Sequence, residues 1–253
     1  MYNPFDLKGA RFLVTGAASG IGRSTCNLIS KLNGRVIGLD INEEGLKELL
    51  LSLEGEGHSI YCFDLRDVDK IPHLIAELVA QGGLLSGFVH AAGVHCIYPV
   101  RLLESGAYRP MLQINTEAAL GLTRGFQRNG MYNKQGSSIV FISSVMAFVG
   151  SSGASAYSLS KSALVGLSKS LALELAPKRI RVNCVVPGFI KTPMFERVSA
   201  NWDSEQRLQV EKEHPLGLGE PDDVANAIVF LLAESGKWIT GSALVVDGGY
   251  TAH

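Results

Sequence analysis

The chain has 253 residues, 46% of them hydrophobic, and a formal net charge of -1. This length suffices for a well-filled core. The balanced charge and the lack of a Lys/Arg run argue against a nucleic-acid or polybasic membrane partner. The first residues lack a signal-peptide pattern, and there is no run of about 18 apolar residues. We therefore expect neither nucleic acid nor membrane as a partner.

The four cysteines do not form a motif. Cys26, Cys62, Cys96 and Cys184 are separated by 36, 34 and 88 positions, which fits neither a zinc site nor a disulfide scaffold. We expect no metal site, reduced thiols and a cytoplasmic protein.

Short apolar runs alternate with amphipathic segments along the whole chain. In chain order they predict strand 11–16, helix 21–32, strand 35–40, helix 43–53, strand 59–64, helix 68–81, strand 85–93 running into a loop, helix 106–128, strand 137–144, helix 157–175, strand 180–188, helix 222–234 and strand 242–248.

The predicted strands are nearly continuous apolar runs, which indicates a parallel sheet buried on both faces. Seven such strands with crossover helices predict an α/β, Rossmann-type doubly wound fold with three layers. No linker or repeat is visible, so we expect one domain over residues 1–253. The polar stretch 189–216 is longer than an ordinary connection, and we expect it to be a lid over a substrate site.

The stretch TGAASGIG (15–22) follows the first strand and opens the first helix. Its glycines Gly16, Gly20 and Gly22 allow a tight turn and close approach of a pyrophosphate to the helix N-terminus. A glycine-rich turn without a ligand is the alternative. The strand-turn-helix context favours dinucleotide binding.

Two acidic residues follow the next strands. Asp40 lies 20 residues after Gly20, and an acid there accepts hydrogen bonds from the adenosine ribose and repels a 2′-phosphate. Neither Ile41 nor Asn42 offers a compensating positive charge, so Asp40 favours NAD over NADP. Its alternative role is a helix N-cap. For Asp64, a contact with the edge of the adenine and a helix-capping role are equally supported.

Polar candidates for chemistry lie outside the carboxyl ends of the strands, where such folds bind ligands. They are Asn115, the pair Ser143 and Ser144, and Tyr157 with Lys161. Tyr157 and Lys161 share a helix face at i, i+4. A nearby positive charge lowers a phenol's pKa, so we expect Lys161 to tune Tyr157 for acid/base work. A serine hydroxyl would stabilise a developing oxyanion.

These motifs together resemble the short-chain dehydrogenases/reductases, in the branch of about 250 residues. The resemblance covers about 7 to 250 and rests on TGAASGIG (15–22), HAAG (90–93), QIN with Asn115, Ser144 placed 13 residues before Tyr157, YSLSK (157–161), VVPGFIKTPM (185–194) and GSALVVDGG (241–249). The Ser–Tyr interval selects Ser144 over Ser143.

The resemblance implies hydride transfer between NAD(H) and a carbonyl or alcohol. Tyr157 would be the general acid/base, Lys161 would tune it and hold the nicotinamide ribose, Ser144 would polarise the substrate oxygen, and Asn115 would hold a relay water. A homotetramer or homodimer built on 106–128 and 157–175 is also implied. The cofactor residues would be Gly16, Ser19, Gly20, Ile21, Gly22, Asp40, Ile41, Asp64, Leu65, Ala91, Ala92, Gly93, Tyr157, Lys161, Pro187, Gly188, Ile190 and Thr192.

One motif departs from the family pattern. His90 and Ala91 stand where the family usually has two asparagines. We interpret His90 as a structural replacement for the lost polar tie. His95 and Cys96 follow in the loop over the site and are candidates for the pocket wall, although Cys96 has no visible partner that would activate its thiol.

Three functions are weighed. The first is an NAD(H)-dependent alcohol dehydrogenase or carbonyl reductase. The second is a 3-oxoacyl-carrier-protein reductase using NADPH, which Asp40 disfavours. The third is a non-catalytic binding protein on the same fold. The substrate is not identified by the sequence, but the expected pocket is fairly apolar. It would draw on Ile97, Tyr98, Val145, Met146, Phe148, Phe189, Met194, Phe195 and Trp202.

Overall fold

A seven-stranded parallel sheet lies at the centre of the protein. The computed structural model describes residues 2–252. Its strands are β1 (Arg11–Thr15), β2 (Arg35–Asp40), β3 (Ser59–Cys62), β4 (Gly87–His90), β5 (Ser137–Ile142), β6 (Ile180–Pro187) and β7 (Ala243–Val246). Their order is β3-β2-β1-β4-β5-β6-β7, and all neighbours pair in parallel. The direction of winding reverses between β1 and β4, which confirms the predicted doubly wound fold and marks the switch point where such folds bind ligands.

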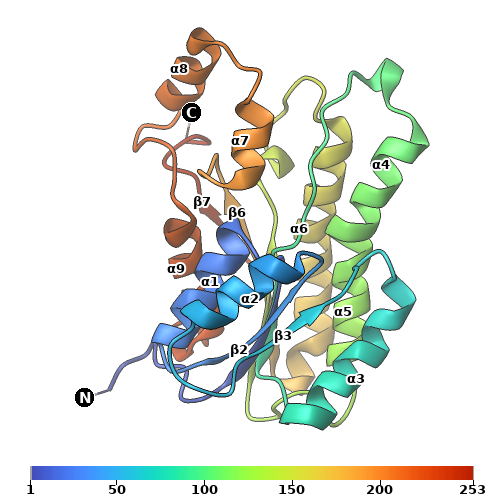
Figure 1. Cartoon of the computed structure of the whole chain (residues 1–253), viewed down its shortest axis with the longest axis vertical. Coiled ribbons are helices and arrows are strands. Elements are labelled where there is room, and N and C mark those ends of the chain that lie inside the picture. Colours follow the sequence, from blue (N-terminus) through green and yellow to red (C-terminus); the bar gives the residue numbers. More distant parts are fainter. Residues whose placement is uncertain (1, 253) are drawn as a thin grey trace.

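Helices cover both faces of this sheet and complete the three layers (Figure 1). One face carries α1 (Gly20–Lys31), α2 (Glu43–Ser52) and α9 (Pro221–Leu232), and the other carries α3 (Ile71–Gly82), α4 (Ser105–Leu112), α5 (Ala118–Phe126) and α6 (Ser155–Leu175). Within residues 2–252, no helix combines the length and the apolarity that crossing a bilayer requires.

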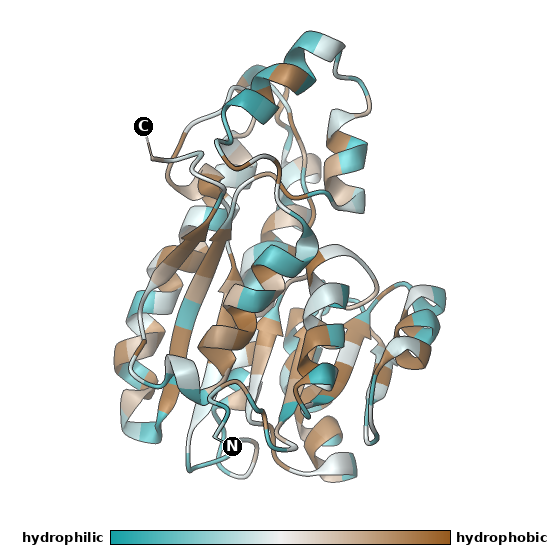
Figure 2. Cartoon of the chain, turned by 90° about the vertical axis from the view of Figure 1, so that its left-hand side faces the viewer, coloured by the Kyte–Doolittle hydropathy of each residue, from teal (hydrophilic) through white to brown (hydrophobic). Residues whose placement is uncertain are grey.

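The strands pack against a separate apolar core on each face. Phe88 of β4 meets Phe126 of α5 edge-on at 5.5 Å between ring centroids in one core. Cys26 and Ile29 of α1 pack in the other. The strands are mostly brown in Figure 2, whereas the helices turn teal residues outward. Burial on both faces explains why the strands lack an alternating polar pattern.

The predicted helix 106–128 is interrupted. α4 and α5 are separated by a π-helical turn, Gln113–Glu117. Pro110 lies inside α4 and lacks the N–H that a regular helix would use there. The wide turn brings Asn115 to a fully buried position facing the strand ends. Such π turns are frequent at functional sites.

The segment 189–216 forms two short helices above the carboxyl ends of the strands, at the top of Figure 1. They are α7 (Pro193–Ser199) and α8 (Ser204–Lys212). Thr192 caps α7 by accepting the Phe195 N–H at 3.2 Å. The base of this lid segment is closed by an ion pair between Lys191 and Glu220 at 2.6 Å. Backbone hydrogen bonds from Lys191 to Gly219 at 2.9 Å and from Leu216 to Gly248 at 3.0 Å hold both ends of this segment on the body.

Candidate active site

The glycine turn between β1 and α1 is shaped for an anion. Gly16 has φ +69°, and a Cβ there would lie 2.7 Å from the Ala92 nitrogen. A Cβ on Gly22 would overlap the Gly16 carbonyl oxygen. Ser19, the N-cap of α1, makes no side-chain capping bond, so the first N–H groups of the helix remain available. Compact backbone with free N–H groups at a helix N-terminus fits a pyrophosphate.

Asp40 ends β2 beside this turn. Its carboxylate accepts backbone N–H bonds from Ala18 at 3.1 Å and from Asn42 at 3.0 Å. The N-cap of α2 is Asn42, which accepts the Gly45 N–H at 3.1 Å, so the capping alternative for Asp40 is wrong. Asp40 instead joins the strand end to the glycine turn, and Ile41 beside it is exposed.

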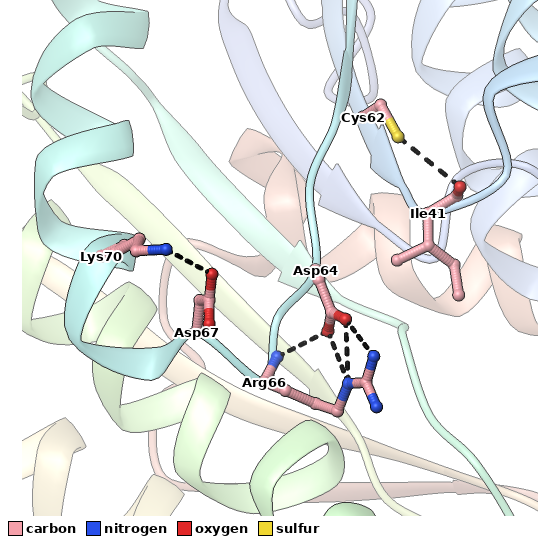
Figure 3. Close-up of polar contacts among 6 residues, drawn as sticks. All are labelled: Ile41, Cys62, Asp64, Arg66, Asp67 and Lys70. Atoms are coloured by element: carbon pink, nitrogen blue, oxygen red, sulfur yellow. Dashed lines mark hydrogen bonds and ion pairs between the residues drawn. The ribbon is translucent and has the colours of Figure 1, made fainter.

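Asp64 lies past β3 and is engaged by a basic neighbour (Figure 3). Arg66 donates to its carboxylate from Nε at 2.9 Å and from a terminal nitrogen at 2.5 Å. The side-chain hydrogen bond from Arg66 is the main reason that the pKa of Asp64 is lowered. Leu65 is buried. The Asp64 carboxylate that would contact adenine is therefore already hydrogen-bonded to Arg66. The contact with adenine stays a prediction.

His90, at the end of β4, is a buried connector. Its Nδ1 lies 2.9 Å from the Thr15 hydroxyl, which itself accepts the Ala92 N–H at 3.1 Å. Its Nε2 lies 3.0 Å from the carbonyl oxygen of Ile114. Because a carbonyl only accepts, Nε2 carries the proton and Nδ1 accepts from Thr15. Burial, with help from the Lys161 charge, lowers the pKa of His90 to about 4. The predicted structural tie is thus present.

Asn115 fastens the loop after β4. Its Oδ1 accepts the Val94 N–H at 2.9 Å, and its Nδ2 donates to the Val94 carbonyl at 3.0 Å and to the Ser160 hydroxyl at 3.0 Å. Both amide protons are therefore used by the protein. The relay water implied by the resemblance stays a prediction. Ser160, inside YSLSK, was not singled out by sequence, since only its contact with Asn115 reveals its role.

The two serines after β5 have different surroundings. The Ser143 hydroxyl donates to the Lys161 carbonyl at 2.8 Å and so braces α6. The Ser144 hydroxyl accepts the Met146 N–H at 3.2 Å and lies close enough to the Tyr157 phenol to oppose the rise of its pKa. Ser144 is thus the serine that accompanies the phenol, in agreement with the Ser–Tyr interval.

Tyr157 and Lys161 lie together on α6, but their electrostatics differ from our expectation. The Lys161 ammonium donates to the Ile142 carbonyl at 2.8 Å and lies 5.7 Å from the Tyr157 ring centroid. Burial raises the pKa of Tyr157 to about 12, with an opposing effect from the Ser144 hydroxyl. Burial also lowers the pKa of Lys161 to about 8. In the protein alone desolvation outweighs charge attraction, so Tyr157 is a protonated phenol, suited to giving a proton to a carbonyl oxygen.

One cavity of about 200 Å³ is lined by Ser144, Tyr157 and Lys161 but not by Asn115. Predicted cofactor residues on its wall are Ile21, Ala91, Gly93, Tyr157, Lys161, Pro187, Gly188, Ile190 and Thr192. Predicted pocket residues on it are His95, Ile97, Val145, Met146, Phe189, Met194, Phe195 and Trp202, whereas Tyr98 and Phe148 do not line it. Ala154 also lines it and was missed, because nothing in its chemistry stands out in a sequence, whereas Val198 belongs to the segment 189–216 that was expected to cover the pocket.

The cavity reaches from the lid to the glycine turn. A Cβ on Gly20 would lie 3.2 Å from Thr192 Cγ2, and one on Gly93 would lie 3.4 Å from both Asn115 Oδ1 and Lys161 Nζ. The glycines therefore bring the turn, the lid base and the reacting groups close to one another. This arrangement is compatible with a nicotinamide dinucleotide.

Comparisons with known proteins agree with this class of site. A family model described as enoyl-(acyl carrier protein) reductase matches residues 16–251. The 3-oxoacyl-(acyl-carrier-protein) reductase FabG of Thermotoga maritima is 33% identical over 252 residues, with 96% of this chain and 98% of the relative covered. The 2,5-dichloro-2,5-cyclohexadiene-1,4-diol dehydrogenase of Sphingobium indicum is 34% identical over 250 residues, with 98% and 99% covered.

A solved structure extends the likeness. A protein from Beutenbergia cavernae, described as an NAD(P)-dependent gluconate 5-dehydrogenase with bound NADP, aligns with a TM-score of 0.90 at 30% identity, covering 99% of this chain and 100% of the other. Fold, site and relatives define a nicotinamide-dependent oxidoreductase. The chain belongs to the short-chain dehydrogenase/reductase family.

Proposed function

We propose that this protein interconverts a secondary alcohol and a ketone, with NAD(H) preferred over NADP(H). The observation that carries the proposal is the meeting of Ser144, Tyr157 and Lys161 on the wall of one cavity that also contacts the glycine turn through Ile21. A nicotinamide nucleotide bound along that turn supplies or accepts the hydride. The protein provides the proton and the alignment.

In the reductive direction, the carbonyl carbon gains the hydride and its oxygen gains a proton from the Tyr157 hydroxyl. Ser144 donates a hydrogen bond to the same oxygen and stabilises its developing negative charge. The Lys161 ammonium, held at the Ile142 carbonyl, lies close enough to favour the phenolate that remains. Asn115 holds Val94 in place, and a relay water near Asn115 returns the proton to Tyr157.

We extend the proposal to the cofactor residues that the family resemblance implies. Gly16, Ser19, Gly20 and Gly22 receive the pyrophosphate, and Ala91, Ala92 and Gly93 lie along the cofactor at β4. Ile41, Asp64 and Leu65 border the adenine, while Pro187, Gly188, Ile190 and Thr192 border the nicotinamide.

Asp40 is the basis of the NAD preference. Its carboxylate lies beside the glycine turn, bound to the Ala18 N–H, and would repel a 2′-phosphate. The Beutenbergia cavernae structure contains NADP, which makes the preference worth measuring directly. We expect NADH to bind at least tenfold more tightly than NADPH, or ~1.4 kcal/mol, in fluorescence titrations. Equal dissociation constants would remove Asp40 from this role.

The proposal extends to the organisation of the protein. Residues 1–253 form one catalytic domain, whose first and last residues lie outside the described part, and 189–216 close over a small-molecule substrate. Exposed Leu159 and Leu173 on α6 and Leu120 on α5 support a homotetramer or homodimer built on these helices. Four free cysteines support work in the cytoplasm.

A second candidate is a 3-oxoacyl-(acyl-carrier-protein) reductase using NADPH. The relative from Thermotoga maritima favours it, because that protein bears this name and matches nearly the whole chain. A non-catalytic role has no support, since the reacting groups are complete.

The deciding experiment is a screen of alcohols and ketones with each oxidised and reduced cofactor, followed at the nicotinamide absorbance. Turnover of simple alcohol and ketone pairs with NAD(H) supports the first candidate. Turnover confined to acyl thioesters with NADPH supports the second.

A further inference from the structure

Two polar side chains on the substrate part of the cavity wall, His95 and Ser151, have no assigned role, and only His95 packs on the ring of Tyr157. His95 lines the cavity beside Tyr157, and the wall around it is largely apolar, with Ile97, Met146 and Phe195. The hydroxyls and the ammonium of Ser144, Tyr157 and Lys161 belong to the reacting end. His95 is a separate hydrogen-bonding group above an apolar surface.

The position of His95 is fixed from several directions. The preceding residue, Val94, is held at both its N–H and its carbonyl by Asn115. Further along the same loop, the Tyr98 N–H donates to the Gly153 carbonyl at 3.0 Å. The His95 ring itself packs edge-to-face on the Tyr157 ring, with 4.4 Å between centroids. A ring held in this way is prepared to meet a ligand without rearrangement.

The nitrogens of this ring are available. Among residues 2–252, no side chain or backbone group hydrogen-bonds to either His95 nitrogen, whereas His90 has a partner on each. Partly buried polar groups normally find a partner in protein, water or ligand. Burial and then the Lys161 charge lower the pKa of His95, so the ring is neutral near pH 7 and offers one donor and one acceptor.

We propose that His95 recognises a second oxygen of the substrate, so that the preferred substrates are hydroxy ketones, diketones and the matching diols rather than simple ketones. The inference rests on the proposed alcohol and ketone chemistry at Tyr157. The two rings are in contact, with 4.4 Å between centroids, so a substrate whose two oxygens lie on adjacent carbons can reach both side chains. A neutral imidazole favours a hydroxyl or carbonyl over a carboxylate, which would gain no ion pair from it.

The test compares two ketones that differ in one group. The probes are 2-hydroxycyclohexanone and 2-methylcyclohexanone, which have nearly the same shape. We expect the wild-type kcat/KM to favour the hydroxy ketone about tenfold, because a hydrogen-bonding site rejects an analogue that leaves its polar group unpaired. His95→Leu should reduce this ratio to near one, and His95→Asn should restore part of it.

A neighbouring residue supplies the matched control. Cys96 shares the loop, contacts Met111 at 3.9 Å between sulfurs and does not line the cavity. Cys96→Ala should keep the wild-type ratio of the two ketones. If it abolishes the ratio as His95→Leu does, the effect comes from the loop backbone and the role of His95 is overturned.

A binding measurement separates this inference from the proposed function. Cyclohexane-1,2-diol and 2-methylcyclohexanol are titrated into the protein with NADH, where no oxidation can occur. If the diol binds more tightly than the methyl alcohol and His95→Leu removes that difference, the role of His95 is supported even when no ketone is turned over. In that case only the proposed reaction is overturned. Turnover of both ketones with equal kcat/KM by the wild type, or an equal loss on both in His95→Leu, overturns the role of His95 and leaves the reaction standing.

Discussion

The strand-end floor of the site consists of His90, Asn115, Ser144, Tyr157 and Lys161. All of these side chains except that of Tyr157 are hydrogen-bonded to backbone groups, at 2.8–3.2 Å. The lid segment above it (189–216) is tied to the body at its ends by backbone hydrogen bonds, such as that from the Leu216 N–H to the Gly248 carbonyl at 3.0 Å, and is packed internally by ring contacts. Phe189 meets Phe195 at 6.1 Å and Trp202 at 6.3 Å between centroids. Hydrogen bonds fix direction as well as distance, whereas apolar contacts tolerate repacking. The floor is therefore suited to one chemical step, and the lid to adjusting which substrate receives it.

The largest effect that this comparison predicts is at Tyr157. Tyr157→Phe removes the hydroxyl that gives the proton to the carbonyl oxygen in the proposed mechanism, while the ring keeps its place among its neighbours. We expect kcat to fall by about 10³-fold or more, since general acid/base catalysis commonly contributes 10²–10⁴-fold. Dissociation constants for NADH, measured by fluorescence, should change less than about threefold. Near-normal turnover by the variant would remove Tyr157 from the acid/base role.

The next effect concerns the buried histidine of the floor. His90 has a folded pKa of about 4, below the ordinary value of 6.5. Between pH 4 and 6.5 the imidazole of His90 is protonated in the unfolded chain but neutral in the folded protein. The contribution of His90 burial to the free energy of unfolding is therefore fully present above pH 6.5 and is lost as the pH falls towards 4. This loss amounts to at most about 3 kcal/mol. His90→Asn should flatten the urea-unfolding free energy over this range relative to the wild type.

An exposed histidine provides the comparison for that measurement. The His73 side chain is 79% exposed on α3, where its Nε2 lies 3.1 Å from Glu77. His73→Asn should reproduce the wild-type dependence of stability on pH. Parallel curves for wild type and His90→Asn would show that burial of His90 does not couple to folding.

The smallest expected effect lies in the lid. Trp202→Ala removes a ring that contacts Phe189 and Phe195 and lines the cavity. Because the lid rests on apolar contact, we expect KM to rise about tenfold and kcat to change by less than about threefold, consistent with a loss of uniform binding. Trp238 is 97% exposed, and Trp238→Ala should leave KM unaltered. A collapse of kcat in Trp202→Ala would mean that the lid orders the floor.

Much of the floor was predictable because its signals are local. The i, i+4 spacing of Tyr157 and Lys161 places them on one helix face wherever that helix lies. The glycines of the turn can be recognised in the sequence because they directly follow a predicted strand. Ser144 could be chosen through its interval to Tyr157, and the structure supports that choice by assigning Ser143 to the backbone of α6.

Other features depended on contacts between distant segments. Asn115 was predicted as a site residue, but its pairing with Val94 needs a π turn that no periodicity reveals. Arg66 follows Asp64 closely, yet only the backbone path after β3 decides that the two side chains meet. The predicted lowering of the Tyr157 pKa failed for the protein alone, because the degree of burial cannot be read from spacing.

The sequence by itself determined the parallel sheet, the glycine turn and the residue types of the reacting groups, since these follow from runs and short intervals along the chain. The tertiary structure decided which polar groups are already satisfied and which remain open. His90 and His95 are five residues apart, and one is sealed between Thr15 and Ile114 while the other faces the cavity with free nitrogens. That difference arises because hydrogen-bond partners and solvent access come from segments far away in the chain.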